Sequence, residues 1–321
     1  FHCDILAMAD SFAKYILNPS AEDVFCGSPP LAFTFGLGGL LVFPARFGAR
    51  VVYFDGGGPD VILNTIETYK VTTFFTAPTA YKILIDQIGD RDVTSLKTCV
   101  SAGEYLPVSV SDDFYKATGI RLIDGIGATE MIHVFISSSG DEIRPGSTGK
   151  VVPGYRAEVW DKNNKKLPAG IAGRLVVKGP TGCRYLNGDQ QEKYVVNGWN
   201  LTGDIFKQDA DGYFWFVARD DDIIISAGYN IASPEVEQAV IAHDAVAECA
   251  VVGTRDPDRG MIVKAFIVLN EGFNSGDELS KDIQVFVKET IAPYKYPRAI
   301  EFIESLPKSA TGKLLRKDLK N

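Results

Sequence analysis

Lys313 lies near the end of the chain in the stretch PKSATGKLLR, and its setting suggests phosphate chemistry. A Gly–Lys pair is typical of phosphate-binding loops of the form G-x-x-x-x-G-K-[ST]. That form fails here, because Pro307 stands at the first glycine position and Leu314 at the hydroxyl position. On this stretch alone, the better interpretation is a solvated lysine in a polar C-terminal turn.

Two glycine-rich segments follow predicted strands and carry polar side chains. Residues 101–105 read SAGEY, and residues 124–130 read DGIGATE. Ligands of open parallel sheets bind beyond the carboxyl ends of strands, and glycine lets the backbone approach a flat or phosphorylated ligand. Thr129 could bond a phosphate, and Glu130 could hold a hard cation such as Mg²⁺. The second segment misses the G-x-G-x-x-G pattern at Glu130, so a dinucleotide fold is not predicted. Taken alone, it also fits an ordinary tight turn.

A carboxylate and a guanidinium complete the candidate groups. Asp204 follows Thr202-Gly203 in a predicted loop, and Arg219 ends a predicted strand. If both reach one cleft, they could clamp the hydroxyls of a ribose. The alternative is a turn aspartate and a surface ion pair, which would contribute little to stability.

The elements that would position these residues alternate through the first 180 residues. β-Branched and aromatic runs predict buried strands at 49–55, 71–78, 97–103 and 120–127, and helical patterns lie between them at 59–70 and 107–119. Such alternation predicts βαβ units and a largely parallel sheet, in an α/β large domain. Residues 146–218 instead predict strands and turns, as in a small antiparallel or barrel-like subdomain.

A compact α+β unit is predicted after Asp222. Its helices are expected at 234–243, beginning from a Ser233-Pro234 cap, and at 279–291, with strands at 246–252, 262–269 and 299–303. The acidic stretch from Arg219 to Asp222 is the expected boundary, which divides the chain into domains at 1–220 and 221–321.

Charge and cysteine usage exclude several functions. Lys and Arg total 33 against 41 Asp and Glu, a formal charge of −8, which argues against a general nucleic-acid or anionic-membrane surface. Five cysteines without a C-x-x-C pair predict free thiols in a reducing compartment, so we expect a cytoplasmic protein. The first 17 residues predict an amphipathic helix without initiating methionine, cap or signal-peptide pattern, from which we expect the chain to be part of a longer protein.

Taken together, the motifs GATE, TGD, R-x-D-D, SAGYNI with PEVE, and PKSATGK occur in a fixed order along the whole chain. This set resembles the adenylate-forming superfamily of acyl-CoA synthetases, luciferases and peptide-synthetase adenylation domains. The stretches PPLAFTFGLGG, DGIGATEMIH, KGPTGCRYL and APYKYPR are similar to the benzoate and 2-aminobenzoate-CoA ligase branch. The resemblance implies that residues 1–220 are the C-terminal part of a large AMP-binding domain, and that residues 221–321 form a mobile domain.

The resemblance also implies the chemistry. A carboxylate attacks the α-phosphate of ATP with Mg²⁺ present, and the thiol of coenzyme A then attacks the acyl-adenylate. Lys313 would be the mobile catalytic lysine, because a cation at the forming mixed anhydride stabilises the transition state. The small domain would then rotate about Asp221, so that another of its faces lines a pantetheine tunnel.

Carried over by position, the resemblance implies four groups of site residues. The AMP or ATP site would comprise Gly103, Glu104, Tyr105, Asp124, Gly125, Ile126, Gly127, Asp204 and Arg219, with Thr129 at the phosphate and Glu130 at the metal. The acyl pocket would be lined by Thr34, Phe35, Ala102, Gly127, His133 and Val134. The CoA tunnel would comprise Ser226, Ala227, Gly228, Tyr229 and Asn230. His133 would be a pocket wall that bonds a ring substituent or the carboxylate, and would not act as a base.

Two features depart from the superfamily pattern. Many relatives have an aromatic residue on the adenine where Ile126 stands, so the contact here would be aliphatic. The Ser/Thr/Gly-rich loop that holds the β- and γ-phosphates, of the form T-S-G-T-T-G-x-P-K, is absent from the chain. We therefore expect the 321-residue chain to be inactive alone, whether the loop was removed or was never present.

The sequence thus predicts an aromatic acid–CoA ligase whose substrate is an aromatic carboxylic acid. This function is consistent with a role in aromatic degradation. Whether the protein forms a homodimer is left open. A medium-chain acyl-CoA synthetase is the rival within the class, although bulky Phe33 and Phe35 argue against a long acyl chain. A peptide-synthetase adenylation domain is disfavoured, because no carrier segment follows Lys313. A noncatalytic nucleotide- or acyl-binding module is the rival from another class, on account of the absent loop.

Overall fold

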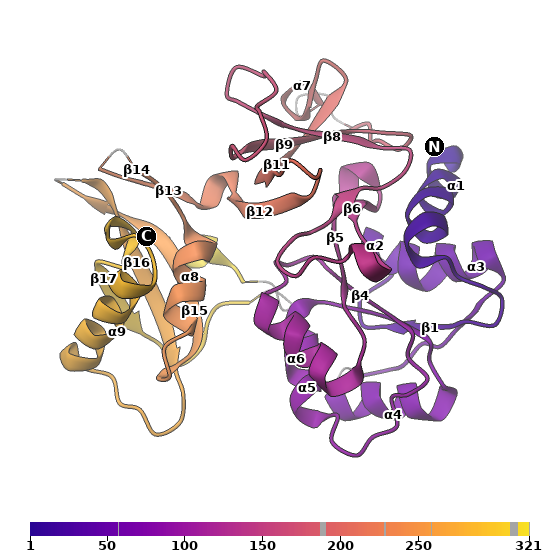
Figure 1. Ribbon diagram of the computed structural model, residues 1–321, viewed down its shortest axis with the longest axis horizontal. Helices are drawn as coiled ribbons and strands as arrows, with labels where there is room; N and C mark the ends of the chain where they lie inside the picture. The colour runs from indigo at the N-terminus through magenta and orange to yellow at the C-terminus, as the bar shows by residue number, and fades with distance from the viewer. Residues whose placement is uncertain (57, 187–190, 228, 258, 309–313, 321) are drawn as a thin grey trace. The chain divides into compact units, whose positions relative to one another are not determined.

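The structure is a computed structural model that describes residues 1–56, 58–186, 191–227, 229–257, 259–308 and 314–320 (Figure 1). The chain divides into two compact units. The first comprises Phe1–Thr202 and Phe206–Phe216, and the second comprises Gly203–Ile205 and Val217–Asn321. None of the helices in the described ranges is both long and apolar enough to cross a bilayer.

Within the described part of the first unit, a seven-stranded sheet carries the motifs. Its strands lie in the order β2 (Arg50–Val51), β1 (Val24–Gly27), β3 (Thr73–Thr76), β4 (Thr98–Ala102), β5 (Ile123–Gly127), β6 (Val134–Ser137) and β7 (Lys150–Val151). The pairs from β2 to β5 are parallel, and β6 and β7 add antiparallel edges. The predicted α/β class and largely parallel sheet are therefore confirmed. The strand predicted at 49–55 is wrong in length, because only Arg50–Val51 pairs with a neighbour.

Helices α4 (Pro59–Tyr69), α5 (Pro78–Gln87) and α6 (Val108–Thr118) gather on one side of the sheet (Figure 1). Alternate strand residues point to this side, so Phe74, Cys99 and Leu122 join the helices in one buried cluster. α6 ends at Gly119, which has a φ of 74°, a left-handed conformation that favours glycine. The helices predicted at 59–70 and 107–119 are thus confirmed.

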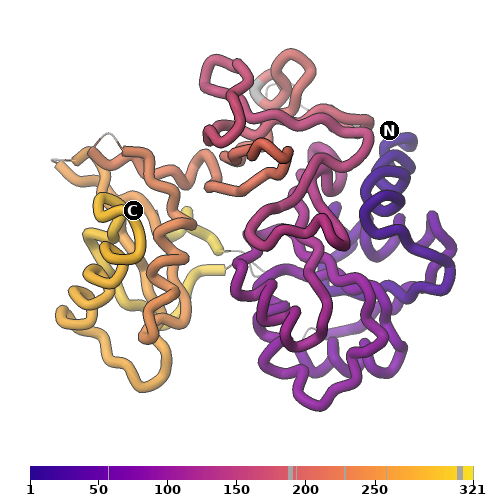
Figure 2. The backbone as a smooth tube through the Cα atoms, viewed as in Figure 1, coloured from indigo at the N-terminus to yellow at the C-terminus, as the bar shows by residue number. Residues whose placement is uncertain are grey.

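The opposite side of the sheet is covered by the N-terminal segment. α1 (His2–Met8) continues into the π-helical η1 (Ala9–Leu17), which contacts β6 and α3 (Phe43–Phe47) (Figure 2). Between η1 and α3 in the chain, α2 (Thr34–Leu37) leads into η2 (Gly38–Val42). The second buried cluster includes Phe12, Phe43, Phe75 and Val100, which join these helices to the strands. The apolar face of the predicted N-terminal helix is therefore part of the core.

The strand-rich region forms a second sheet of β8 (Arg156–Trp160), β9 (Gly173–Lys178), β10 (Val195–Val196), β11 (Trp199–Gln208) and β12 (Phe214–Arg219). The β8–β9 and β10–β11 pairs are antiparallel, as predicted for this region. Short helical turns at η3 (Thr129–Met131) and η4 (Gly140–Glu142) precede this sheet, and α7 (Gln191–Tyr194) interrupts it.

After β12, the second unit contains η6 (Asp220–Asp222) and a hairpin of β13 (Ile223–Ser226) and β14 (Tyr229–Ala232). α8 (Ser233–Ile241) and α9 (Asp277–Thr290) pack with a sheet of β15 (Val246–Asp256), β16 (Gly260–Leu269) and β17 (Ala299–Phe302). Short turns follow at η7 (Pro293–Lys295) and η8 (Arg316–Leu319). The predicted α+β unit is confirmed, but the predicted Ser233 cap is wrong. The Ser233 hydroxyl instead donates a hydrogen bond to the Asp222 carbonyl, at 2.9 Å.

A buried ion-pair cluster ties the C-terminal segment to this unit. Arg316 donates from Nη2 to Glu237 Oε2 at 2.7 Å and from Nε to Glu237 Oε1 at 3.2 Å, and its Nη1 lies 3.3 Å from Asp222 Oδ2. Glu237 is 8% exposed and also accepts the Val251 N–H. A buried carboxylate needs such partners, because desolvation of an unpaired charge is costly.

We expect Arg316→Met to lower the free energy of unfolding of the second unit by about 3–5 kcal/mol, because it leaves Glu237 buried without its partner. The double variant with Glu237→Leu should recover much of this loss, since both charges are then gone. Lys308→Met is the matched control, because the Lys308–Glu248 pair is more exposed and should contribute less than about 1 kcal/mol. Urea unfolding of the wild type and these three variants measures this, and a double variant no more stable than Arg316→Met would contradict it.

Candidate active site

The ends of β4, β5 and β6 gather most of the predicted nucleotide and acyl residues. Parallel pairing sets Ala102 of β4 opposite Gly125 of β5, and antiparallel pairing sets Gly127 opposite Val134 of β6. Gly103 follows β4 with a φ of 91°, which a residue with a side chain rarely adopts. The two glycine-rich segments found in the sequence therefore lie side by side at one edge of the sheet.

Glu104 and Tyr105, predicted for one face of an adenine, are both held by side chains of the first unit. The Thr79 hydroxyl donates a hydrogen bond to Glu104 Oε2. Tyr105 stacks on Phe216 of β12, with ring centroids 5.7 Å apart and an interplanar angle of 29°. Tyr105 is thereby joined to the second sheet, and its ring plane is set by a neighbour 111 positions further along the chain.

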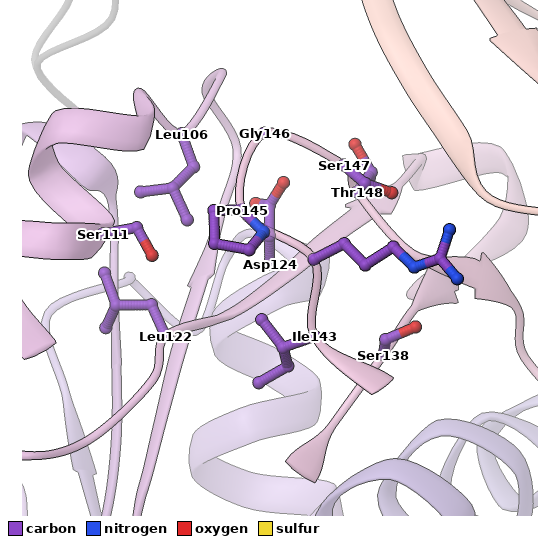
Figure 3. A pocket seen from close by; sticks show the side chains of 11 residues that line it. Leu106, Ser111, Leu122, Asp124, Ser138, Ile143, Pro145, Gly146, Ser147 and Thr148 are labelled. Carbon is purple, nitrogen blue, oxygen red and sulfur yellow. The ribbon is translucent and has the colours of Figure 1, made fainter. Parts of the chain in front are cut away.

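Asp124 borders a small cavity of about 10 Å³ between β5 and the segment of residues 143–148 (Figure 3). This volume is about that of a single water molecule. Burial raises the pKa of Asp124 to about 7, against the opposing effects of the Gly125 N–H and the Thr148 hydroxyl. The protonated and ionised forms of this carboxyl therefore have similar populations near neutral pH.

Thr129 and Glu130 lie in η3, directly after β5. The Tyr185 hydroxyl donates a hydrogen bond to Glu130 Oε1 at 2.6 Å. No group of three or more His, Cys, Asp or Glu side chains in the described ranges could hold a metal ion. A single partly buried carboxylate nevertheless suits Mg²⁺, which is usually bound through one or two carboxylates together with substrate phosphates. Glu130 could therefore hold the Mg²⁺ that accompanies ATP.

His133 is 2% exposed and lies among aromatic rings of three helical segments. Its ring centroid is 4.6 Å from Phe43, 5.2 Å from Phe12 and 5.9 Å from Phe35. Burial lowers the pKa of His133 to about 3, so the imidazole is neutral at pH 7, and the Phe35 carbonyl opposes this shift only in part. Apart from this weak interaction with the Phe35 carbonyl, neither ring nitrogen has a hydrogen-bond partner among the described residues.

The residues predicted to line the acyl pocket have different neighbours in the structure. Phe35 and His133 lie together, and Phe35 also contacts Phe75, with ring centroids 5.3 Å apart. A side chain at Gly127 would meet the His133 backbone, because its Cβ would lie 2.7 Å from the carbonyl oxygen. Gly127 therefore permits the β5–β6 pairing as much as it leaves room for a ligand. Val134 is buried against Gly125, and Thr34 begins α2.

Asp204 and Arg219, predicted at the ribose, pair with each other in the second unit. Arg219 Nη1 donates to Asp204 Oδ1 at 2.9 Å, and the Arg219 side chain is 50% exposed while that of Asp204 is 10% exposed. Among the three consecutive aspartates, Asp222 is buried and ion-paired, whereas the Asp221 side chain is 77% exposed. The predicted hinge residue is thus not held by its side chain as Asp222 is.

The predicted CoA residues lie along the β13–β14 hairpin. Ser226 is buried, and Ala227 has a φ of 47°, a strained value for a residue with a side chain. Tyr229 and Asn230 are exposed in β14, and the Tyr229 ring stacks on Tyr294 with centroids 4.4 Å apart. Gly228 and Lys313 lie outside the described residues, so their predicted roles stay predictions.

Three residues at the site were not assigned a role from the sequence. Phe12 and Phe43 enclose His133; the apolar face of the N-terminal helix was a sequence signal for Phe12, and no sequence signal pointed to Phe43. Tyr185 contacts Glu130 across 55 positions from an irregular segment, where no periodicity could indicate it.

Comparison with known proteins places these features in a family. The model of the family described as AMP-binding enzyme matches residues 2–185, and the model described as AMP-binding enzyme C-terminal domain matches residues 235–313. The chain belongs to the AMP-binding enzyme family. The resemblance to adenylate-forming enzymes is thereby confirmed.

Several relatives are similar over nearly the whole chain. The benzoate–CoA ligase of Thauera aromatica is 36% identical over 100% of this chain and 62% of the ligase. The mitochondrial acyl-coenzyme A synthetase ACSM3 of Rattus norvegicus is 45% identical over 81% of this chain and 46% of the synthetase. The crystal structure of the anthranilate CoA ligase AuaEII in complex with anthranoyl-AMP is 38% identical, with a TM-score of 0.90 over 99% of this chain and 63% of that one. The chain therefore spans about half to two thirds of the length of these proteins.

We expect Asp124→Asn to change how stability depends on pH. A carboxyl whose pKa is raised from 3.8 to about 7 on folding stabilises the fold at low pH, and this contribution is lost as pH rises from about 4 to 7. Relative to the wild type, the variant should therefore gain about 2–4 kcal/mol in unfolding free energy between pH 4 and pH 7. Urea unfolding at several pH values measures this. Asp112→Asn, at a surface pair with Arg121, is the control, and parallel curves for wild type and Asp124→Asn would refute the expectation.

Proposed function

We propose that the full-length protein is an aromatic carboxylic acid–CoA ligase of the benzoate or 2-aminobenzoate type. It would activate the acid with ATP and Mg²⁺ as an acyl-adenylate and then transfer the acyl group to coenzyme A. Family membership supports adenylate chemistry. The printed names of the benzoate–CoA and anthranilate CoA relatives support an aromatic acid.

The observation that carries the aromatic substrate is the setting of His133. A buried imidazole whose ring nitrogens lack a full hydrogen bond costs about 1–3 kcal/mol, and a ligand that bonds it recovers this free energy. The surrounding rings of Phe12, Phe35 and Phe43 are apolar and suit a flat aromatic ring. An amino or hydroxyl substituent beside the carboxylate would supply the missing hydrogen bond, as in 2-aminobenzoate.

In the first half-reaction, an oxygen of the substrate carboxylate attacks the α-phosphate of ATP, and the bond to pyrophosphate breaks. Two anions approach each other, so the barrier falls when a cation lies at the forming anhydride. We assign that cation to Lys313. Bound Mg²⁺ supplies neutralisation of the phosphate charge. Glu130 is its proposed ligand, Thr129 is assigned to a phosphate, and Asp204 with Arg219 is assigned to the ribose.

In the second half-reaction, the CoA thiol attacks the acyl carbonyl and AMP leaves. We assign residues 221–321 to a mobile domain that rotates about Asp221 between the two steps. The face with Ser226, Ala227 and Tyr229 would then line the pantetheine tunnel. The Asp221 side chain is 77% exposed and forms a long ion pair, 3.8 Å from Arg219 Nε, which supports a hinge there because such an exposed pair contributes little when it is broken. A cytoplasmic location, a role in aromatic degradation and a homodimer stay predictions from the sequence.

A medium-chain acyl-CoA synthetase is the second candidate. It is favoured by the 45% identity to the rat acyl-coenzyme A synthetase, which exceeds the identity to the benzoate–CoA ligase. The two candidates differ in whether the pocket prefers a rigid ring or a flexible chain.

Ala102→Leu tests the acyl pocket in the full-length protein. Ala102 is 6% exposed at the end of β4, so three added carbons should fill the proposed ring slot and lower kcat/KM for benzoate by about 10- to 100-fold. ATP binding should survive. Acid-dependent ATP–pyrophosphate exchange with benzoate, 2-aminobenzoate and hexanoate measures the selectivity.

Ala239→Leu is the matched control, because it overfills the core of the second unit without reaching β4. It should lower stability and leave the ratio of rates among the acids unchanged. If Ala102→Leu leaves that ratio unchanged too, Ala102 does not line the pocket. A wild-type preference for hexanoate would favour the second candidate.

Lys313→Ala tests the assignment of the two half-reactions. Removing one well-placed charge should cost about 3–4 kcal/mol, so ATP–pyrophosphate exchange should fall by roughly a hundred- to a thousandfold. The same variant, given preformed benzoyl-adenylate and CoA, should still form the thioester, because that step uses a different face of the domain.

Lys308→Ala is the control for Lys313→Ala, since it removes a nearby lysine that pairs with Glu248. It should retain both half-reactions. An equal loss of both half-reactions in Lys313→Ala would show that the lysine supports the fold. No loss in either would identify a solvated lysine without a catalytic role.

A further inference from the structure

The Tyr185 hydroxyl donates a hydrogen bond to Glu130, with 2.6 Å between the hydroxyl oxygen and Glu130 Oε1. The two residues are 55 positions apart, and Glu130 lies in η3 directly after β5. One carboxylate oxygen of Glu130 is therefore engaged by a neutral donor that reaches it from a distant segment. Such a bond fixes the rotation of the carboxylate, which an exposed glutamate does not otherwise maintain.

The segment that carries Tyr185 is itself held in place. The Tyr185 N–H donates to Gln191 Oε1 at 2.9 Å, and Gln191 Nε2 donates to the Cys183 carbonyl at 3.4 Å. The Tyr185 ring also meets the Tyr194 ring edge-on, with centroids 5.9 Å apart and an interplanar angle of 84°. Gln191 and Tyr194 are the two ends of α7. Tyr185 is thus braced by a short helix on its backbone and on its ring.

Three contacts therefore fix the position of the Tyr185 hydroxyl, and that hydroxyl donates its hydrogen bond to the carboxylate of Glu130. If the Tyr185 bond only stabilised the fold, its acceptor could be any buried carbonyl. Tyr155 shows that arrangement, because its hydroxyl lies 3.0 Å from that of Thr181, which in turn donates to the Met131 carbonyl. Tyr185 differs in that its acceptor is the carboxylate proposed to hold a cation.

We propose that Tyr185 is a positioning residue that orients Glu130 for the cation bound with ATP. This inference rests on the proposed function, since it assumes that Glu130 holds Mg²⁺. Carboxylates that bind metal ions are commonly hydrogen-bonded by an outer partner, and loss of that partner typically weakens metal affinity or activity by about 10- to 100-fold. α7 contributes to this positioning as well, because Gln191 fixes the backbone of Tyr185.

Tyr185→Phe in the full-length protein is the direct test, because it removes the hydroxyl and keeps the ring against Tyr194. Mn²⁺ binding in the presence of ATP, followed by electron paramagnetic resonance, should weaken by about tenfold or more. In ATP–pyrophosphate exchange, the Mg²⁺ concentration for half-maximal rate should rise by a similar factor, while the rate at saturating Mg²⁺ falls much less. Gln191→Leu should shift both quantities in the same direction by a smaller factor.

Tyr81→Phe is the matched control, since it removes buried phenol hydrogen bonds to the Phe74 and Val100 carbonyls in the cluster with α4 to α6, and it should leave Mn²⁺ affinity unchanged. Glu130→Gln is the positive control for loss of the ligand. Unchanged Mn²⁺ affinity in Tyr185→Phe, or tighter binding from release of a competing donor, would overturn the proposal. So would Mn²⁺ binding with ATP that Glu130→Gln leaves intact. If the wild-type protein binds Mn²⁺ with ATP but no acid supports its pyrophosphate exchange, the proposed function is refuted. The effect of Tyr185→Phe on Mn²⁺ affinity would still test the positioning role.

Discussion

Parallel pairing of β3, β4 and β5 is the constraint on which the candidate site depends. Because parallel strands end at the same edge of their sheet, the segments after β4 and β5 must lie side by side, although 20 or more positions separate them in the chain. The pairing in turn depends on burial of both faces of these strands. Alternate residues enter two different cores, so that Phe74 and Cys99 face the helices α4 to α6 while Phe75 and Val100 face the N-terminal helices. A shift of one residue in register would exchange these faces and displace the site as well.

The same burial creates the chemical character of the site. Enclosure by Phe12, Phe35 and Phe43 lowers the pKa of His133 to about 3, and burial raises the pKa of Asp124 to about 7. Each shift favours a neutral form at a place where water is scarce. If His133 lines the proposed acyl pocket, its neutral imidazole would bond a ring substituent without strongly attracting a carboxylate. The negative charges of the proposed acid and nucleotide would then be met by other cations, and the chain's formal charge of −8 makes those cations local features rather than a general surface property.

Much of the fold and part of the site could be predicted from the sequence, and the reasons differ from residue to residue. The end of α6 was predicted to within one residue, because Gly119 is a helix stop signal, and in the structure it is the cap after Thr118, with a φ of 74° that favours glycine. Strand β2 was predicted too long, since a β-branched run does not show how many of its residues find a partner. Ser233 follows the pattern of a helix cap, yet it is the first residue of α8 with Ala232 as the N-cap, and its hydroxyl donates to the Asp222 carbonyl, a tertiary contact that local sequence does not encode. The role of Tyr185 could not be predicted for a similar reason, because it depends on a hydrogen-bond acceptor 55 positions away in the chain.

The two units also support their candidate residues by different physical means. In the first, the ends of hydrogen-bonded strands fix the backbone, and aromatic packing or a single phenol fixes each side chain. In the second unit, ion pairs between charged side chains hold elements together, since Arg316 joins Glu237 of α8 to Asp222 of η6. Ion pairs are sensitive to the loss of either partner, whereas strand pairing and apolar packing are spread over many contacts. A unit held in this way can keep its internal structure while one exposed residue, such as Asp221, changes its backbone angles. That combination is what a domain needs if it is to serve two successive half-reactions with two of its faces.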